Sequence, residues 1–283
     1  MYKYLQLKLW PYTLALLLAF SFASCEKITD PIEEGGKLEP NTVTGKVTDA
    51  QGNALGGVKI RAENPLGNNM HVDGTTGADG RYLLKLTGIG GWKIYAWKEV
   101  TYKGKVYHLR LGMKEAADYD AFATNDKSVT KDFVWKLSGR IPDRSASHEN
   151  GWGYFGGSLR FVNLNNLVPA MAAGTKVTIT LTPVNGAKYL DGTPATQPVV
   201  NTFTLQEGNT NYYIGDIPVA EYRMTASSLL NGVTKQVYIG GNSTTALFEW
   251  LEFDFDPATN STGTYENGLK SPSDFPFYMG QKN

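Results

Sequence analysis

Residues 45–60 read GKVTDAQGNALGGVKI, and residues 75–86 read TTGADGRYLLKL. In both stretches, apolar and polar residues alternate and are interrupted by turn residues. Alternation with a period of two is typical of a strand with one buried face. Asp49 can accept backbone hydrogen bonds within a turn, and Gly52 supplies a positive φ angle. The two stretches therefore predict strands joined by tight turns.

The same pattern continues on the C-terminal side of these stretches. Residues 92–100 and 106–111 flank a Tyr-Lys-Gly-Lys turn, which predicts a hairpin. Residues 132–137 alternate again and close the set. Long helical patterns are absent, and the counts of 31 Gly and 16 Tyr favour an all-β protein.

The two quoted stretches resemble the carboxypeptidase regulatory-like domain, an accessory domain found beside carboxypeptidases. The residues that fit its pattern are Gly45, Val47, Asp49, Gly52, Leu55, Gly57, Val58, Ile60, Thr76, Asp79, Gly80, Tyr82 and Leu84. The resemblance covers about residues 42–137. It implies a small Greek-key β-sandwich of the prealbumin-like kind.

A second β region is predicted for residues 151–256, after a polar linker at 138–150. Short alternating segments recur through this region, as in Ig-like sandwiches. Residues 217–226, IPVAEYRMTA, are similar to a segment common in such modules. Residues 257–283 are rich in Gly, Pro and Ser and are interpreted as a C-terminal tail. The predicted fold class is all-β, with two tandem β-sandwich domains.

The N-terminus has the order of an export signal: the basic residues Lys3 and Lys8, a short apolar run at 14–22, and small residues before Cys25. Residues 22–25, Phe-Ala-Ser-Cys, resemble a bacterial lipobox, which implies cleavage after residue 24 and acylation of Cys25, for example with palmitate. A transmembrane anchor and ordinary cleavage after Ala23 are the alternatives. Acylation gives the chain's single cysteine a use.

Residues 25–41 are polar and are interpreted as the acylated Cys25 followed by a tether. The acids of this segment resemble the signal that sends some Gram-negative lipoproteins to the cell surface. The expected location is the outer membrane, on its surface or periplasmic face. The 27 basic and 27 acidic residues balance, and no basic block stands out, so nucleic acid is an unexpected partner.

No catalytic, metal or cofactor site is predicted. The three histidines, His71, His108 and His148, lie outside any zinc-peptidase spacing. No nucleophile elbow, phosphate loop or dinucleotide fingerprint is present. The acids Glu252, Asp254 and Asp256 share one face of a predicted strand. They are interpreted as a solvated face, with a hydrolase as the alternative.

Aromatic side chains give the candidate ligand-binding residues. Tyr95 and Trp97 share one face of a predicted strand, opposite the face of Trp92 and Ile94. Trp152, Tyr154 and Phe155 lie among glycines in a predicted loop. Such rings can stack on a sugar or a protein partner, or they can cover the core.

The sequence therefore predicts a non-catalytic, lipid-anchored envelope protein. Its predicted role is to bind or scaffold a polysaccharide or an envelope protein. A passive spacer is the leading alternative.

Overall fold

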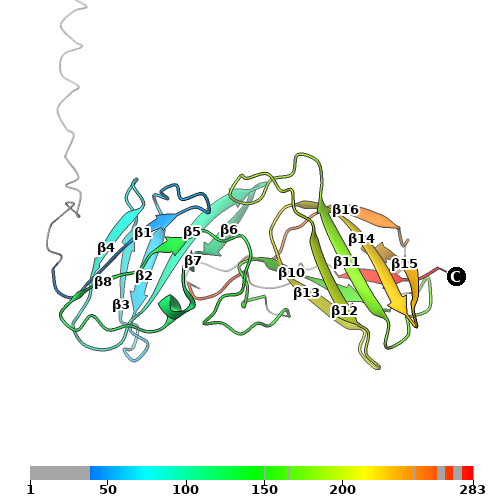
Figure 1. Ribbon diagram of the computed structural model, residues 1–283, viewed down its shortest axis with the longest axis horizontal. Helices are drawn as coiled ribbons and strands as arrows, with labels where there is room; N and C mark the ends of the chain where they lie inside the picture. The colour runs from blue at the N-terminus through cyan, green and yellow to red at the C-terminus, as the bar shows by residue number, and fades with distance from the viewer. Residues whose placement is uncertain are drawn as a thin grey trace, which may run out of the picture. The chain divides into compact units, whose positions relative to one another are not determined.

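The computed structural model describes residues 39–149, 151–164, 166–244, 246–259, 265–269 and 276–282. The predicted signal peptide, Cys25 and most of the predicted tether lie outside the described residues. The described residues fall within one compact unit. Its strands, shown in Figure 1, belong either to sheets formed by residues 42–134 or to a sheet formed by residues 157–280.

Two sheets make up the first module. One has the order β3-β2-β5-β6, with bounds His71–Thr75, Lys59–Glu63, Lys93–Tyr102 and Lys105–Arg110. The other has the order β4-β1-β9-β7, with bounds Arg81–Lys85, Thr42–Thr48, Phe133–Val134 and Gly112–Met113, and β8 (Ser128–Thr130) also pairs with β1. Strand β1 is antiparallel to β4 and parallel to β8 and β9. A short 3₁₀ helix, η1, spans Ala116–Tyr119.

The motif residues of the first module fix its turns and its closest backbone contacts. The Asp49 carboxylate accepts hydrogen bonds from the amides of Gln51 (2.9 Å) and Asn53 (2.8 Å), as the predicted turn requires. The Tyr82 hydroxyl donates to the Lys131 carbonyl at 2.6 Å. A Cβ at Gly45 would lie 1.9 Å from the same carbonyl oxygen, so only glycine allows this approach.

The second module is formed by one eight-stranded sheet with the order β12-β11-β14-β15-β17-β10-β13, in which β16 also pairs with β14. Its strands are β10 (Gly157–Val162), β11 (Lys176–Pro183), β12 (Val199–Thr204), β13 (Asn211–Ile217), β14 (Glu221–Leu230), β15 (Val233–Gly240), β16 (Trp250–Asp254) and β17 (Phe277–Gly280).

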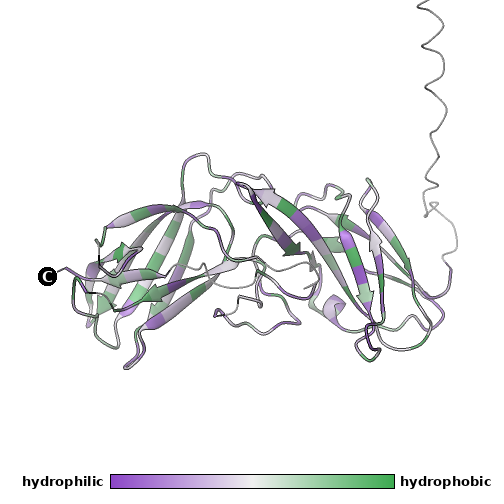
Figure 2. Cartoon of the chain, turned by 180° about the vertical axis from the view of Figure 1, so that it is seen from behind, coloured by the Kyte–Doolittle hydropathy of each residue, from purple (hydrophilic) through white to green (hydrophobic). Residues whose placement is uncertain are grey.

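Strand β15 pairs with β14 through its first half and with β17 through its second half. It therefore belongs to both halves of the sheet, which enclose a core that includes Phe161, Ile179 and Tyr222. The alternation of apolar and polar residues along these strands is visible in Figure 2. The predicted all-β sandwich class is confirmed.

The structure differs from the predicted boundaries at two places. The predicted tail contributes β17, which lies between β15 and β10. In the predicted linker, Ile141 is fully buried and its amide donates to the Gly153 carbonyl at 2.9 Å. Polar, glycine-rich composition concealed both features because a four-residue strand and one apolar side chain produce no periodic signal.

Candidate functional site

The predicted aromatic face of β5 is covered. Tyr95 is 4% exposed and Trp97 is 1% exposed, although their neighbours Ile94 and Ala96 face the opposite side and are buried as well. The Trp97 ring packs against the His108 ring, 4.8 Å away, and against the Tyr265 ring, 5.4 Å away.

Tyr95 and Trp97 therefore follow the alternative in which the rings are covered, and neither presents an exposed face to a ligand. Strand alternation separates the two faces of a sheet but does not reveal what covers the outer one. Here the cover includes Tyr265, a residue far along the chain. The Arg61 guanidinium also lies over the Tyr265 ring, 4.5 Å from the ring centre.

The acids of β16 and the residues after it are paired with cations. Glu252 accepts a hydrogen bond from Arg223 at 2.6 Å, and Asp254 pairs with Lys103. Asp256 pairs with Lys105 at 2.5 Å and accepts a hydrogen bond from the Tyr107 hydroxyl. The three acids are exposed, as the interpretation as a solvated face expects, and two of them also bind the β5–β6 hairpin of the first module.

The titration of Asp256 follows from these contacts. Partial burial acts to raise the pKa of this carboxyl group, but hydrogen bonds from Lys105 and Tyr107 outweigh it, so the pKa is lowered. Burial, and then the hydrogen bond to Asp256, raises the pKa of Tyr107. Both groups are held in their ordinary charge states at neutral pH, as expected of a structural contact.

In the glycine-rich loop at 151–157, one of the three candidate ligand-binding aromatic side chains is exposed. Trp152 is 39% exposed. Phe155 is 5% exposed and lies in the core, and Tyr154 is half-buried against the His148 ring at 5.3 Å. Of the sequence-predicted aromatic candidates, Trp152 alone has an exposed side chain.

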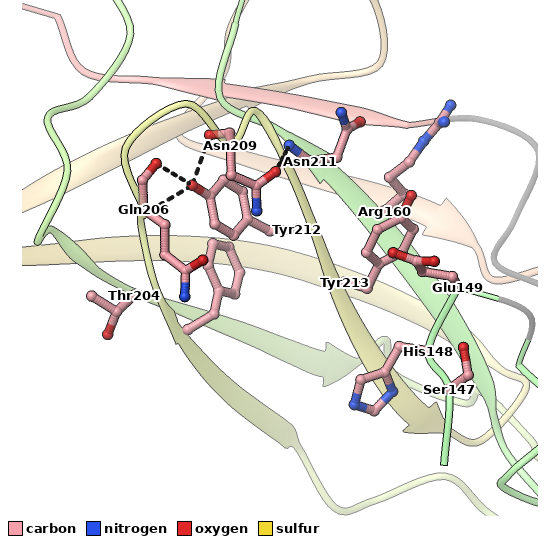
Figure 3. A pocket seen from close by; sticks show the side chains of 11 residues that line it. Ser147, His148, Glu149, Arg160, Thr204, Gln206, Asn209, Asn211, Tyr212 and Tyr213 are labelled. Carbon is pink, nitrogen blue, oxygen red and sulfur yellow. Dashed lines mark hydrogen bonds between the residues drawn. The ribbon is translucent and has the colours of Figure 1, made fainter. Parts of the chain in front are cut away.

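A groove of about 830 Å³ lies where the two edge strands β12 and β13 meet, beside β10 and the loop before it (Figure 3). Its lining is mostly polar and consists of Ser147, His148, Glu149, Arg160, Phe203, Thr204, Gln206, Asn209, Asn211, Tyr212 and Tyr213. Amide, hydroxyl, carboxylate and guanidinium groups therefore converge on one open surface.

Tyr212 holds one wall of this groove in place. Its ring stacks on Phe203, with ring centres 5.0 Å apart and planes 11° apart. Its hydroxyl accepts a hydrogen bond from the backbone N–H of Gln206 at 2.8 Å. The same hydroxyl donates to the backbone carbonyl of Asn209, also at 2.8 Å. These contacts fix the loop that joins β12 to β13, so the amide side chains on it are displayed from an ordered turn.

The second wall depends on close packing of His148. Its ring stacks on Tyr154 with 8° between the planes. A Cβ at Gly215 would lie 2.1 Å from the His148 Nδ1 atom, so the absence of a side chain there allows the ring to reach β13. That nitrogen is buried and has no hydrogen-bond partner among the residues that the structure describes.

Next to this contact, Asp216 connects the predicted linker to β13. Its backbone has a φ of 59°, and its carboxylate accepts the Gly139 amide at 2.7 and 2.8 Å. Burial raises the pKa of Asp216, and the hydrogen bonds from Gly139 and Gly156 oppose that shift. The carboxylate therefore holds one residue at the start of the predicted linker, Gly139, and one beyond its end, Gly156, against the same strand.

Reasoning from the sequence missed this groove. Arg160 and Tyr213 are register partners on β10 and β13, and both side chains are half-buried. Alternation along each strand could have placed each on an outer face, but the pairing of β10 with β13 joins segments about fifty residues apart.

The described part of the chain offers no cluster of three or more His, Cys, Asp or Glu side chains that could hold a metal ion. Within that same part, no helix has the length and apolar character needed to cross a bilayer. The groove offers hydrogen-bonding groups, charges and a tyrosine ring.

Comparison with protein-family models gives no match, and comparison with curated proteins gives none. Among solved structures, the chain is similar to the Bacillus anthracis TIE protein at 11% identity and a TM-score of 0.29, over 85% of this chain and 34% of that one. It is similar to a Streptococcal ancillary pilin at 10% identity and a TM-score of 0.26, over 83% and 63% of the two chains.

A DUF3823 family protein from Bacteroides uniformis is similar at 12% identity and a TM-score of 0.21, over 76% of this chain and 98% of that one. The chain thus spans about a third of the first of these proteins and under two thirds of the second. By its own fold and groove, it is an all-β protein of sandwich modules with an open, polar groove.

Proposed function

We propose that this is a non-catalytic, lipid-anchored envelope protein that binds a polysaccharide in the groove between β12 and β13. The observation that supports this most strongly is that the amide side chains of Gln206, Asn209 and Asn211 line the same groove as the Tyr213 ring. Sugars offer hydroxyl groups that pair with amides and C–H faces that pack on aromatic rings.

The anchor is proposed at Cys25, where several acyl chains would hold the protein on a membrane. The proposed location is the outer membrane of a Gram-negative bacterium, on its surface or periplasmic face. This part of the proposal rests on the sequence pattern at residues 1–25.

The ion pairs of Glu252, Asp254 and Asp256 weigh against the alternative of a hydrolase on that face. A glycosidase acid needs a raised pKa, whereas the pKa of Asp256 is lowered. The groove weighs against a passive spacer, because a spacer has no need of converging polar groups in an open cavity.

A glycan array probed with the full chain in detergent tests the binding function. The double variant Gln206→Ala/Tyr213→Ala should lose the glycan signal and still unfold cooperatively, because both side chains line the groove. Trp250→Ala is the matched control, since it removes an exposed ring outside the lining. A native chain that binds no glycan would favour an envelope-protein partner or a spacer instead.

A further inference from the structure

Arg160 is the one half-buried arginine of the described residues that lacks an ion pair; Arg140 lacks one as well, but it is exposed and donates to the Arg144 carbonyl. Arg61, Arg81, Arg110, Arg144 and Arg223 each form an ion pair with a carboxylate. Arg160 forms no ion pair with any residue that the structure describes, although it is half-buried in the groove wall. A partly desolvated guanidinium that has no carboxylate partner gains more binding free energy from an anion than a fully hydrated guanidinium does.

Resting on the function proposed above, we infer that the groove selects an acidic glycan and that Arg160 binds a uronic-acid carboxylate. A guanidinium presents a planar fork of N–H donors that matches the two oxygens of a carboxylate. Tyr213 is its register partner on the neighbouring strand, so a sugar ring that reaches Arg160 also meets the tyrosine.

The edge of β13 offers one further donor and one acceptor to the same ligand. The backbone N–H of Asn163 donates to the Thr210 carbonyl at 2.8 Å. This bond fixes which facing residues of β10 and β13 form hydrogen-bonded pairs and which form non-hydrogen-bonded pairs. Tyr213 and Arg160 form a non-hydrogen-bonded pair. The backbone N–H and C=O of Tyr213 therefore point away from β10, toward the edge that borders the groove.

Glu149 is the one acid among the lining residues, and it is exposed. It forms no ion pair with Arg160, so the guanidinium remains available to a ligand. A carboxylate accepts hydrogen bonds from sugar hydroxyls. The groove thus combines a cation for the acid group of the glycan with an anion and amides for its hydroxyls.

The test compares uronic-acid oligosaccharides with their carboxyl-reduced neutral forms, using polygalacturonate, polymannuronate and hyaluronan fragments and the full chain in detergent. At least one acidic fragment should bind about tenfold more tightly than its reduced form, and added NaCl should weaken this binding. Arg160→Gln should remove the preference, and Arg160→Lys should retain part of it. Arg81→Gln, at the start of β4 in the first module, is the matched control.

Equal affinity for acidic and reduced fragments, or an unchanged preference in Arg160→Gln, would overturn this inference and leave the proposed function standing. Absence of binding to every acidic and neutral glycan would overturn both. If Arg160→Gln fails to fold, the salt dependence, the reduced fragments and Arg160→Lys still decide the question.

Discussion

The Trp97 ring lies parallel to the His108 ring, with 9° between the planes and 4.8 Å between the ring centres. Both residues lie on the β5–β6 hairpin, and Tyr265 packs on the same indole. Trp97→Ala should therefore destabilise the protein by about 3–5 kcal/mol in denaturant unfolding, as expected for a buried tryptophan. Trp250→Ala is the control, because Trp250 is 50% exposed and its loss should cost under about 1 kcal/mol.

Gly80 combines a positive φ of 77° with close packing, since a Cβ there would lie 2.5 Å from the Val47 carbonyl oxygen. Gly80→Val should cost at least about 2 kcal/mol of unfolding free energy. Gly52→Ala isolates the effect of backbone strain, because its φ is 89° but no atom lies within 4 Å of the added Cβ. Equal losses in the two variants would contradict the role of packing at Gly80.

The Tyr107 hydroxyl donates to Asp256, whose pKa is lowered by hydrogen bonds that outweigh burial. Tyr107→Phe should destabilise the protein by about 1 kcal/mol, the usual net contribution of such a bond. Chemical denaturation of Tyr107→Phe, Asp256→Asn and the double variant measures the coupling between the two residues. Strictly additive losses would show that the bond contributes nothing.

Asp216 has a raised pKa because of burial, so its ionised form is disfavoured in the folded state. A group with a raised folded-state pKa adds stability below its unfolded pKa and loses that contribution as the pH rises through the folded value. The melting temperature of the native protein minus that of Asp216→Asn should therefore increase as the pH falls from neutral toward the unfolded value of about 3.8. A difference that is constant or shrinks on acidification would exclude this linkage.

Cys25→Ser should prevent lipid attachment if residues 22–25 direct acylation. Cells fed labelled palmitate should label the native chain and leave the variant unlabelled. Label in the variant, or none in the native chain, would refute the predicted anchor. Lys27→Ser, two residues further on, is a control that should keep the label.

Local sequence pattern was sufficient to predict most of the strands and the Asp49 and Gly80 turns. These features depend on neighbours within a few residues, such as the bonds from Gln51 and Asn53 to Asp49. The burial of Trp97 was not predictable in this way, because its cover comes from Tyr265. A single strand's alternation contains no information about a distant segment that lies across its outer face.

The groove was hidden for a related reason. Arg160 and Tyr213 each look like ordinary outward positions of a strand, and Asn209 and Asn211 look like turn residues. They become a site only when β13 pairs with β10 and the sheet ends at β12 and β13. The close approach of His148 to Gly215, which shapes one wall of the groove, is likewise visible only in three dimensions.

The position of β17 has a consequence for how the chain matures. β10 is the first strand of its sheet in chain order, yet its neighbour β17 follows every other strand of that sheet. During synthesis, β10 must therefore wait with one side unpaired until β17 has emerged. The sheet of the second module cannot be completed before the last of its strands is available. A stall or truncation before β17 would leave an edge open to quality-control proteases.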